Sequence, residues 1–304
     1  MKSMVTQCLG KVIASEEGGK DGHHLDERLE IIKTPRGDYA NIDTTTVAGL
    51  KQGKALGLVQ SKMAHVIFTP YVQEAAVLFD KNHRGRFFTM LREPVERVIS
   101  EYYFRRMDNE KIRSQSLEDY TLHHAEENWM VRMLTGFMSG PLDIIHLNAA
   151  KEILRSKFLV GLLEQKTESF RRFEEFFGWK FPSPVSQTCK NNAFYFEWHS
   201  GNPHPMPKED DPLIKKIQLL NVWDVALYEY AKQLFTEQKA IFWTQNDSAA
   251  MKWKAKPHNY GEKLPPKKNK LKDVGLKSQN EKLEQLGIKK SSNRNEGYGL
   301  KGSS

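Results

Sequence analysis

An arginine followed by an acidic residue and a proline marks the segment of this chain best suited to chemistry. In the 304-residue sequence, Arg92 ends the aromatic-rich run 87–91, and Pro94 begins a stretch with helical spacing. A guanidinium can hold a phosphate or sulfate through two parallel N–H donors. Ser100, two turns into the predicted helix, adds a hydroxyl group. These residues predict an anion-binding site, and the alternative is an Arg92 that caps a helix or pairs structurally.

The elements expected around Arg92 favour the anion site. A strand over 86–91 places the arginine at its carboxyl end, and Pro94 suits the first helical position, where no N–H is needed. Ligands gather at the carboxyl ends of strands in open α/β sheets, and a helix N-terminus offers N–H groups to an anion. Further strands are predicted at 64–68 and 157–162, and helices at 73–79, 94–106 and 166–177. The alternation predicts an α/β fold with a parallel sheet and helices on both faces.

Other segments are predicted from periodicity and composition alone. Residues 4–14 read as one helix, because their apolar residues recur at helical spacing. Residues 117–134 also read as one helix, and a longer one starts at Pro212. Loops are predicted at 15–27 and 181–207, and a short strand that turns at 41–46.

The formal charge of +8 and the isoelectric point near 9.2 come from one end of the chain. Residues 249–304 hold 14 lysines and arginines against 5 acidic residues, and residues 1–248 hold 32 against 33. The chain is therefore divided into a folded domain, 1–248, and a Lys-rich tail, 249–304, predicted to be disordered. The tail lacks an arginine and aromatic recognition pattern, so no nucleic-acid partner is expected, although a nucleic-acid binder stays as an alternative.

Several other classes of protein find little support in the residue types. Cys8 and Cys189 have no metal-ligand spacing and argue against a disulfide framework or a zinc site. The pairs His23-His24 and His123-His124 are interpreted as surface residues, since adjacent helical residues point about 100° apart. No apolar run of about 18 residues exists, so no targeting or transmembrane segment is expected in this chain. Asn246 heads a formal glycosylation triplet.

The Arg92 segment resembles a known family. The string Leu-Arg-Glu-Pro-Val-Glu-Arg over 91–97, followed by Ser100 and Tyr102-Tyr103, is similar to the 3′-phosphate-binding signature of sulfotransferases that use 3′-phosphoadenosine 5′-phosphosulfate (PAPS). It looks most like the Golgi carbohydrate sulfotransferases, including the heparan sulfate 2-O-sulfotransferases. Five more segments resemble family motifs in the same order, within about residues 1–238: 41–45, 64–66, 128–134, 158–164 and 222–231.

The resemblance implies roles for four residues. Arg92 and Ser100 would hold the 3′-phosphate of PAPS, and no metal is expected. His65 would be the general base that takes the proton of the acceptor hydroxyl, work that suits a side chain titrating near neutral pH. Lys190 would lie over the nucleotide. The alternatives are a structural histidine and a solvated loop lysine.

The resemblance also implies a fold, a reaction and a location. The fold would be the P-loop-NTPase-like sulfotransferase fold, and the reaction would transfer a sulfuryl group from PAPS to a hydroxyl of a glycan or glycosaminoglycan-like acceptor. Relatives act in the Golgi lumen, and a membrane anchor would occur only in a longer form. The first strand and the Pro-Lys-Thr-Gly-type loop for the 5′-phosphosulfate have no counterpart here, so a chain truncated at its N-terminus is expected, with weak donor binding. A catalytically inactive nucleotide-binding relative is the alternative.

Overall fold

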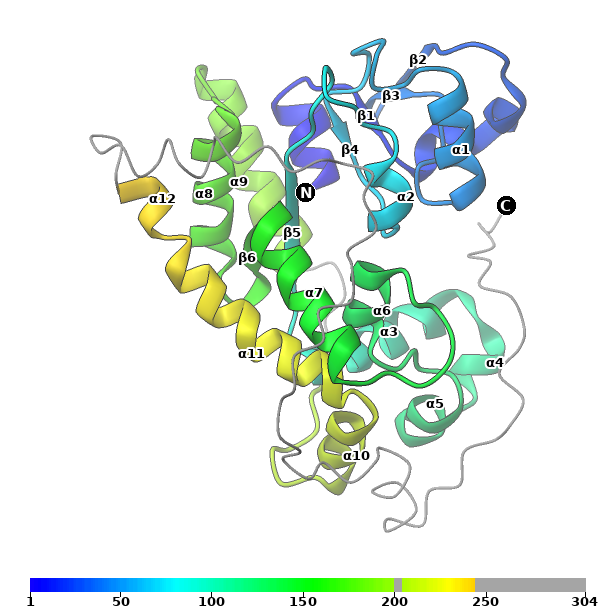
Figure 1. The fold of residues 1–304 in the computed structure, drawn as a ribbon, viewed down its shortest axis with the longest axis vertical. Coiled ribbons are helices and arrows are strands. Elements are labelled where there is room, and N and C mark those ends of the chain that lie inside the picture. The colour runs from blue at the N-terminus through cyan, green and yellow to red at the C-terminus, as the bar shows by residue number, and fades with distance from the viewer. Residues whose placement is uncertain (200–203, 244–304) are drawn as a thin grey trace.

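The structure is a computed structural model that describes residues 1–199 and 204–243 (Figure 1). The predicted tail, 249–304, and the glycosylation triplet at Asn246 lie outside the described residues. No helix in the described ranges is long and apolar enough to cross a membrane.

The strands form two separate sheets. Sheet A holds four strands in the order β2-β3-β1-β4, namely β1 (Ile13–Ala14), β2 (Ile31–Thr34), β3 (Gly37–Ala40) and β4 (Val66–Ile67). Strand β1 runs parallel to both β3 and β4, while β2 and β3 form an antiparallel hairpin. Sheet B pairs β5 (Phe87–Leu91) with β6 (Phe158–Leu162) in parallel, with Phe87 opposite Phe158 and Leu91 opposite Leu162. The predicted mixed α/β architecture with parallel strands is confirmed.

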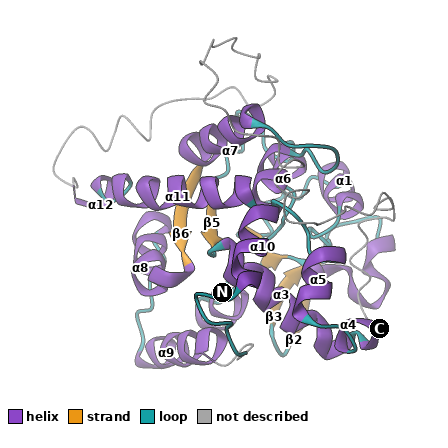
Figure 2. Ribbon diagram, turned by 90° about the horizontal axis from the view of Figure 1, so that it is seen from below, coloured by secondary structure: helices purple, strands orange, loops and turns teal. Residues whose placement is uncertain are grey.

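Helices surround these strands (Figure 2). The short helices of the N-terminal third are η1 (Met4–Cys8), η2 (Glu16–Leu25), α1 (Val47–Ala55) and α2 (Val72–Ala76). Between β5 and β6 lie α3 (Pro94–Asp108), α4 (Glu110–Arg113), α5 (Leu117–His123), α6 (Trp129–Thr135) and α7 (Ile144–Lys157). After β6 come η3 (Leu163–Gln165), α8 (Lys166–Phe177), α9 (Pro184–His199), α10 (Pro212–Leu220), α11 (Val222–Glu237) and α12 (Ala240–Trp243).

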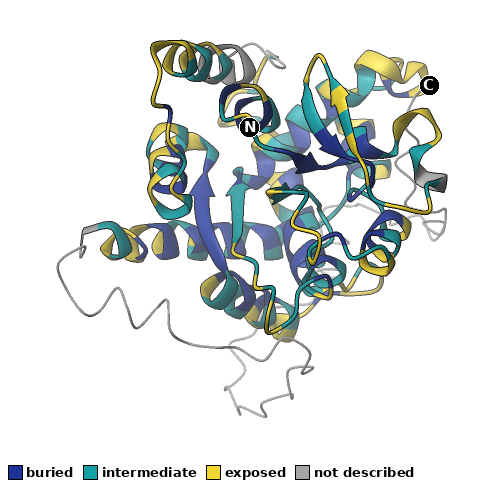
Figure 3. Ribbon diagram, turned by 90° about the horizontal axis from the view of Figure 1, so that it is seen from above, coloured by how far each residue is buried: buried dark blue, intermediate teal, exposed yellow. Residues whose placement is uncertain are grey.

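The largest core cluster lies around β6. Every residue of β6 is buried, and α7 and α11 contribute Leu154, Leu227 and Ala231 to the same cluster. Figure 3 shows β6 in dark blue and the half-buried β5 beside it in teal. Helices α7 and α11 pack against β6, whereas four of the five residues of β5 line a cavity.

The predicted helix over 4–14 is wrong. Residues Met4–Cys8 form one short π-helical segment, and Gly10 then adopts φ +60°, a left-handed conformation that favours glycine. Ile13 continues as part of β1, where it pairs with Tyr39 on one side and Val66 on the other. The apolar residues after Gly10 therefore belong to the sheet and not to the helix.

The single helices predicted at 117–134 and after Pro212 are each broken by an asparagine. Asn128 has φ 53°, and its side chain donates to the carbonyl of Leu220 over 3.0 Å. Asn221 separates α10 from α11 and accepts from the N–H of Asn128 over 2.9 Å. The breaks divide α5 from α6 and α10 from α11, and the buried hydrogen bonds of Asn128 join the two regions.

Two predicted loops are also wrong, and of the strand and turn predicted at 41–46 only the turn is confirmed. Residues 181–207 include the helix α9, and residues 15–27 contain the 3-10 segment η2 with a kink at Gly22. Residues 41–46 form a turn after β3, and the Thr46 side chain caps α1 by accepting from the Gly49 N–H over 3.0 Å. Local hydrogen bonding outweighs the β-favouring composition of this threonine-rich stretch.

A disulfide joins Cys8 of η1 to Cys189 of α9 across a sequence separation of 181 residues. The bridge corrects the expectation that the two cysteines form no disulfide. Their spacing gave no signal, because the two residues come together only in the folded chain. The bridge attaches α9 to η1, and Cys189 and Ala193 of α9 pack against the apolar cluster that holds Met4 and Cys8.

Candidate functional site

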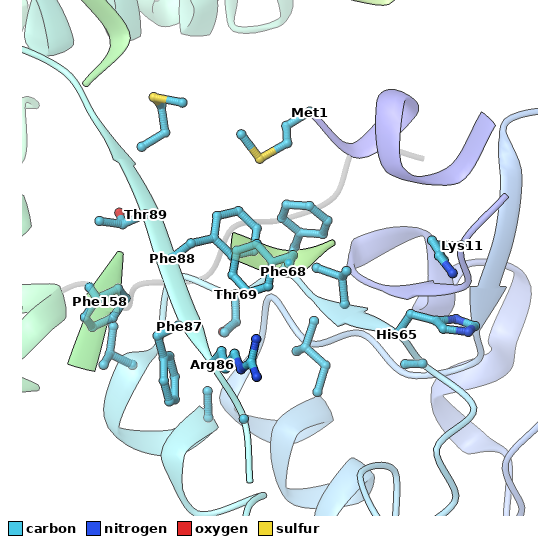
Figure 4. Close-up of a pocket in the computed structure, with 18 of the residues that line it drawn as sticks. Met1, Lys11, His65, Phe68, Thr69, Arg86, Phe87, Phe88, Thr89 and Phe158 are labelled. Atoms are coloured by element: carbon cyan, nitrogen blue, oxygen red, sulfur yellow. The ribbon is translucent and has the colours of Figure 1, made fainter. Parts of the chain in front are cut away.

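A cavity of about 1610 Å³ lies between the two sheets. Strand β4 lines one side and β5 the other, together with the loop that precedes β5 (Figure 4). Phe68 and Phe88 meet inside it, edge to face, with ring centroids 6.1 Å apart. Met1 also lines the cavity.

Consecutive residues line the cavity on both of its sides. All residues of 64–69 line it, and so do all residues of 84–90. Successive side chains of a strand point to opposite faces, so a pocket on one face would contact alternate residues only. Contact with consecutive residues on both strands shows that the cavity separates the edge of β4 from the edge of β5.

Arg92 lines this cavity from the position directly after β5. Its side chain is half-buried, and its Nε atom is buried without a hydrogen-bond partner in the described part of the chain. Pro94 occupies the start of α3, as the sequence predicts. A half-buried guanidinium with spare donors, directed into a cavity, is suited to an anion.

The N-terminus of α3 is partly occupied by its own cap. The Glu93 carboxylate accepts from the Glu96 N–H over 2.8 Å, and burial raises the pKa of Glu93 above its usual value. A carboxyl group therefore already uses one of the N–H groups that the sequence assigned to an anionic ligand. Arg92 remains the stronger anion-binding feature.

Ser100 lies two turns along α3, half-buried, and is not among the residues that line the cavity. The structure therefore brings His65 and Arg92 to the cavity but leaves Ser100 outside its lining.

His65 precedes β4 and lines the cavity. Its backbone N–H donates to the Val12 carbonyl over 2.8 Å, and its Nδ1 accepts from the Val12 N–H over 3.2 Å. A neutral ring whose Nδ1 accepts carries its proton on Nε2. Figure 4 places His65 with Lys11, on the side of the cavity away from β5.

Lys190 lies on α9 and does not line the cavity. Its ammonium pairs with Glu174 at 2.5 Å and lies 5.1 Å from the centre of the Phe181 ring. The neighbouring disulfide at Cys189 holds this part of α9 against η1. The structure thus engages Lys190 in an ion pair and separates it from Arg92 and His65.

Five basic residues that the sequence analysis did not single out line the cavity together with Arg92. Its lining contains six lysines and arginines against two glutamates, Glu96 and Glu164. The cations are Lys11, Lys62, Arg84, Arg86, Arg92 and Lys166. The signal was the basic run Lys-Asn-His-Arg-Gly-Arg at 81–86, directly before the predicted strand. A surplus of cations at a concave surface concentrates anionic ligands.

The search for metal ligands covers the described residues only. No group of three or more potential ligands is found in the residues that the structure describes. His23 pairs with Asp26 at 2.8 Å, and His123 ends α5 at an exposed position.

The comparisons with known proteins include a distant relative among the sulfotransferases. No family model matches the chain. Over 190 residues the chain is 25% identical to heparan-sulfate 6-O-sulfotransferase 2 of Gallus gallus, a match that covers 50% of this chain and 44% of that protein. The chain thus matches less than half the length of this relative. The similarity supports a carbohydrate sulfotransferase family for this chain, at the level of the family.

Proposed function

We propose that this chain is a PAPS-dependent sulfotransferase domain that acts on a hydroxyl of a glycan, with a glycosaminoglycan as the acceptor class. The observation that supports it best is Arg92, placed at the carboxyl end of β5 inside a cavity with a strong surplus of cations. PAPS is polyanionic, and sulfated glycans are polyanionic as well. The named relative adds support from sequence, since its name describes sulfation of heparan sulfate.

The donor side of the proposal rests on Arg92. Its guanidinium would hold the 3′-phosphate through two charge-assisted hydrogen bonds. Ser100 is proposed as a second contact from the same helix, although it does not line the cavity. Lys190 would reach a nucleotide only after leaving Glu174.

The reaction would proceed by attack of an acceptor hydroxyl oxygen on the sulfur of PAPS. The new O–S bond forms as the bond from sulfur to the phosphate oxygen breaks, and adenosine 3′,5′-bisphosphate leaves. His65 is the proposed base for the hydroxyl proton. In the orientation described, its available nitrogen is occupied by the Val12 N–H, so His65 accepts a proton only when that hydrogen bond breaks.

We place the protein in the Golgi lumen, and the Cys8–Cys189 disulfide favours this proposal. Disulfides persist in oxidising compartments such as the secretory pathway and are rare in the cytosol. Glycosylation at Asn246 is part of the same proposal.

We further propose that the chain binds PAPS weakly and turns over slowly or not at all. Among the described residues, no strand pairs with both β4 and β5, so no strand there leads into a loop that could stabilise the charge of the leaving phosphate. The occupied Nδ1 of His65 favours the second candidate function, an inactive relative that binds the nucleotide without transfer.

Two measurements test these proposals. Calorimetric titration with adenosine 3′,5′-bisphosphate should show binding that Arg92→Ala weakens by about 10-fold to 100-fold, since a hydrogen bond to a charged group contributes about 1.5–3 kcal/mol. Arg28→Ala, an arginine with an 85% exposed side chain, is the matched control and should bind like the parent. Equal binding by parent and Arg92→Ala would refute the donor site.

Transfer of labelled sulfate from PAPS to heparan and chondroitin acceptors separates the two candidate functions. Slow transfer supports a sulfotransferase with an incomplete donor site. Nucleotide binding with no transfer supports the inactive relative, and transfer at the rate of intact sulfotransferases would contradict the incomplete site.

A further inference from the structure

We propose that the loop joining α6 to α7, together with the first turn of α7, inserts into the surface of a lipid membrane without net charge. Five apolar residues make up this loop patch, namely Phe137, Met138, Pro141, Ile144 and Ile145. The proposal goes beyond the proposed function and does not depend on it, because none of these residues lines the cavity that holds Arg92.

The first argument is the exposure of large apolar side chains. Phe137 is 38% exposed, Ile144 48% and Ile145 68%. The ring centroids of Phe137 and His146 lie 4.3 Å apart, which joins the loop to the first turn of α7. Single exposed apolar residues are ordinary in soluble proteins, whereas a contiguous group of them marks a contact surface for another protein or a membrane.

The second argument is the lack of charge. Residues 133–150 contain a single charged side chain, Asp143, although 28% of the whole chain is charged. The Asp143 carboxylate accepts from the N–H groups of Ile145 and His146 and lies 2.6 Å from Nδ1 of His146, so it serves the start of α7. Protein interfaces normally carry a polar rim. A patch with so little free charge instead complements a neutral lipid surface and gives no attraction to anionic lipids.

The third argument is that the loop is held in one shape by its own hydrogen bonds. The Arg132 guanidinium donates to the carbonyls of Phe137 and Gly140, over 3.2 and 3.1 Å. Gly136 and Gly140 have φ values of 72° and 86°, a left-handed conformation that favours glycine. Because the backbone is fixed from within, the apolar side chains are already presented before contact, and binding has little further chain to order.

The size of the loop patch favours a membrane over a second copy of this chain. A stable protein interface draws about 20–30 residues from each partner, and the loop patch has five apolar residues. At a lipid surface a few apolar side chains suffice, since each contributes by entering the boundary between headgroups and acyl chains, to a depth of about 5–10 Å. Figure 2 shows α7 at the outer edge of the molecule, a position open to such a surface.

The test is flotation of the full chain with vesicles of phosphatidylcholine alone. The parent should bind these vesicles, and binding should persist in about 1 M salt, where charges are screened beyond about 3 Å. Absence of binding would overturn the proposal. Binding that requires phosphatidylserine and disappears at high salt would overturn it as well, because such binding belongs to basic residues like those of the tail, 249–304.

Substitutions separate the loop patch from general surface hydrophobicity. Ile145→Ser should weaken vesicle binding by about tenfold, the lower end of what burial of one such side chain contributes. Ile145→Leu keeps an apolar side chain and should bind like the parent. Ile31→Ser is the matched control, because Ile31 is 43% exposed on β2. Equal binding by Ile145→Ser and the parent would refute the role of the loop patch.

A nitroxide label at Ser139→Cys reports insertion directly. Ser139 is exposed within the loop, and Ser114, exposed after α4, is the control position. On vesicles, collisions with oxygen should increase and collisions with a water-soluble nickel complex should decrease for the label at Ser139→Cys only. Unchanged collision rates there would contradict insertion. Light scattering completes the set: dimers of the parent that Ile145→Ser dissociates, without vesicle binding, would assign the patch to a second copy and overturn the proposal.

Discussion

The backbone N–H of Val12 donates to Nδ1 of His65 over 3.2 Å, while the backbone N–H of His65 donates to the Val12 carbonyl over 2.8 Å. The two contacts hold His65 beside Val12, the residue directly before β1. Because Nδ1 of His65 already accepts a hydrogen bond, the neutral ring is positioned to donate one through Nε2. The catalytic role proposed for His65 therefore depends on breaking this pair.

The tautomer of His65 is directly measurable. Nitrogen-15 NMR of the histidine rings should show the neutral His65 ring with its proton on Nε2, because Nδ1 accepts from Val12. A proton on Nδ1 would contradict the hydrogen bond. If His65 acts as the base, His65→Ala should slow sulfate transfer by about 10²–10⁴-fold with nucleotide affinity unchanged. His123→Ala, at an exposed position on α5, is the control.

Removing the disulfide should destabilise the fold. The Cys8–Cys189 bridge closes a loop with a sequence separation of 181 residues, and loss of such a crosslink costs about 2–5 kcal/mol of unfolding free energy. Urea unfolding of Cys8→Ser/Cys189→Ser should show this loss. A reducing agent should destabilise the parent and leave the double variant unaffected. Equal stability of the parent with and without reductant would show that the bridge does not form.

Acid should weaken the ion pairs of Glu168 within α8. Hydrogen bonds from Arg171 and Arg172 lower the pKa of Glu168 to about 2, from its ordinary value of 4.5. A carboxyl group with a lowered folded pKa stabilises the fold above its unfolded pKa and loses that contribution as the pH falls through the folded value. The parent should therefore have a larger free energy of unfolding than Glu168→Gln above pH 4.5. This advantage should shrink as the pH falls toward 2.

The same pH series includes Glu110→Gln, on the exposed surface of α4, as the matched control. A difference for Glu168→Gln that grows as the pH falls would contradict the assigned sign.

Asp224 should be the least replaceable acidic residue of the core. Its fully buried carboxylate accepts from the N–H groups of Met130 and Val131, each over 2.9 Å, and burial raises its pKa. Asp224→Ala leaves two N–H groups of the first turn of α6 without these acceptors, at a cost of about 2–5 kcal/mol. Asp108→Ala, at an exposed position, should change stability by about 0.5 kcal/mol or less. Chemical unfolding measures both, and equal effects would refute the role of Asp224.

Periodicity predicted the elements whose stabilising contacts repeat along the sequence. The helix over 166–177 is confirmed as α8, and the strands at 86–91 and 157–162 are confirmed as β5 and β6. In these segments the apolar pattern and the end signals, such as Gly178 after α8, agree with the tertiary packing. His65 and Arg92 both line one cavity, but His65 directly precedes β4 whereas Arg92 directly follows β5, so their positions along the strands did not predict this.

The remaining features depend on contacts between distant segments. The helix predicted at 4–14 failed because Ile13 pairs with two strands that only the folded chain brings together. No local sequence pattern predicts that Lys190 pairs with Glu174 or that Cys8 bonds to Cys189. No local pattern predicts the cavity between β4 and β5 either, because it lies between two strands that do not pair.

The Cys8–Cys189 bridge also turns most of the described chain into a covalent ring, with β1 to β6 and α1 to α8 inside it. A protease that cuts once within the ring, for example at the exposed residues 107–111, would leave both pieces linked. Such a nicked protein would migrate as one band on a gel without reductant and as two bands with it. Such a cut separates β5 from β6 along the sequence, so the bridge would keep the two strands of sheet B in one molecule, and the nicked protein would be heavier than the intact one by only one water.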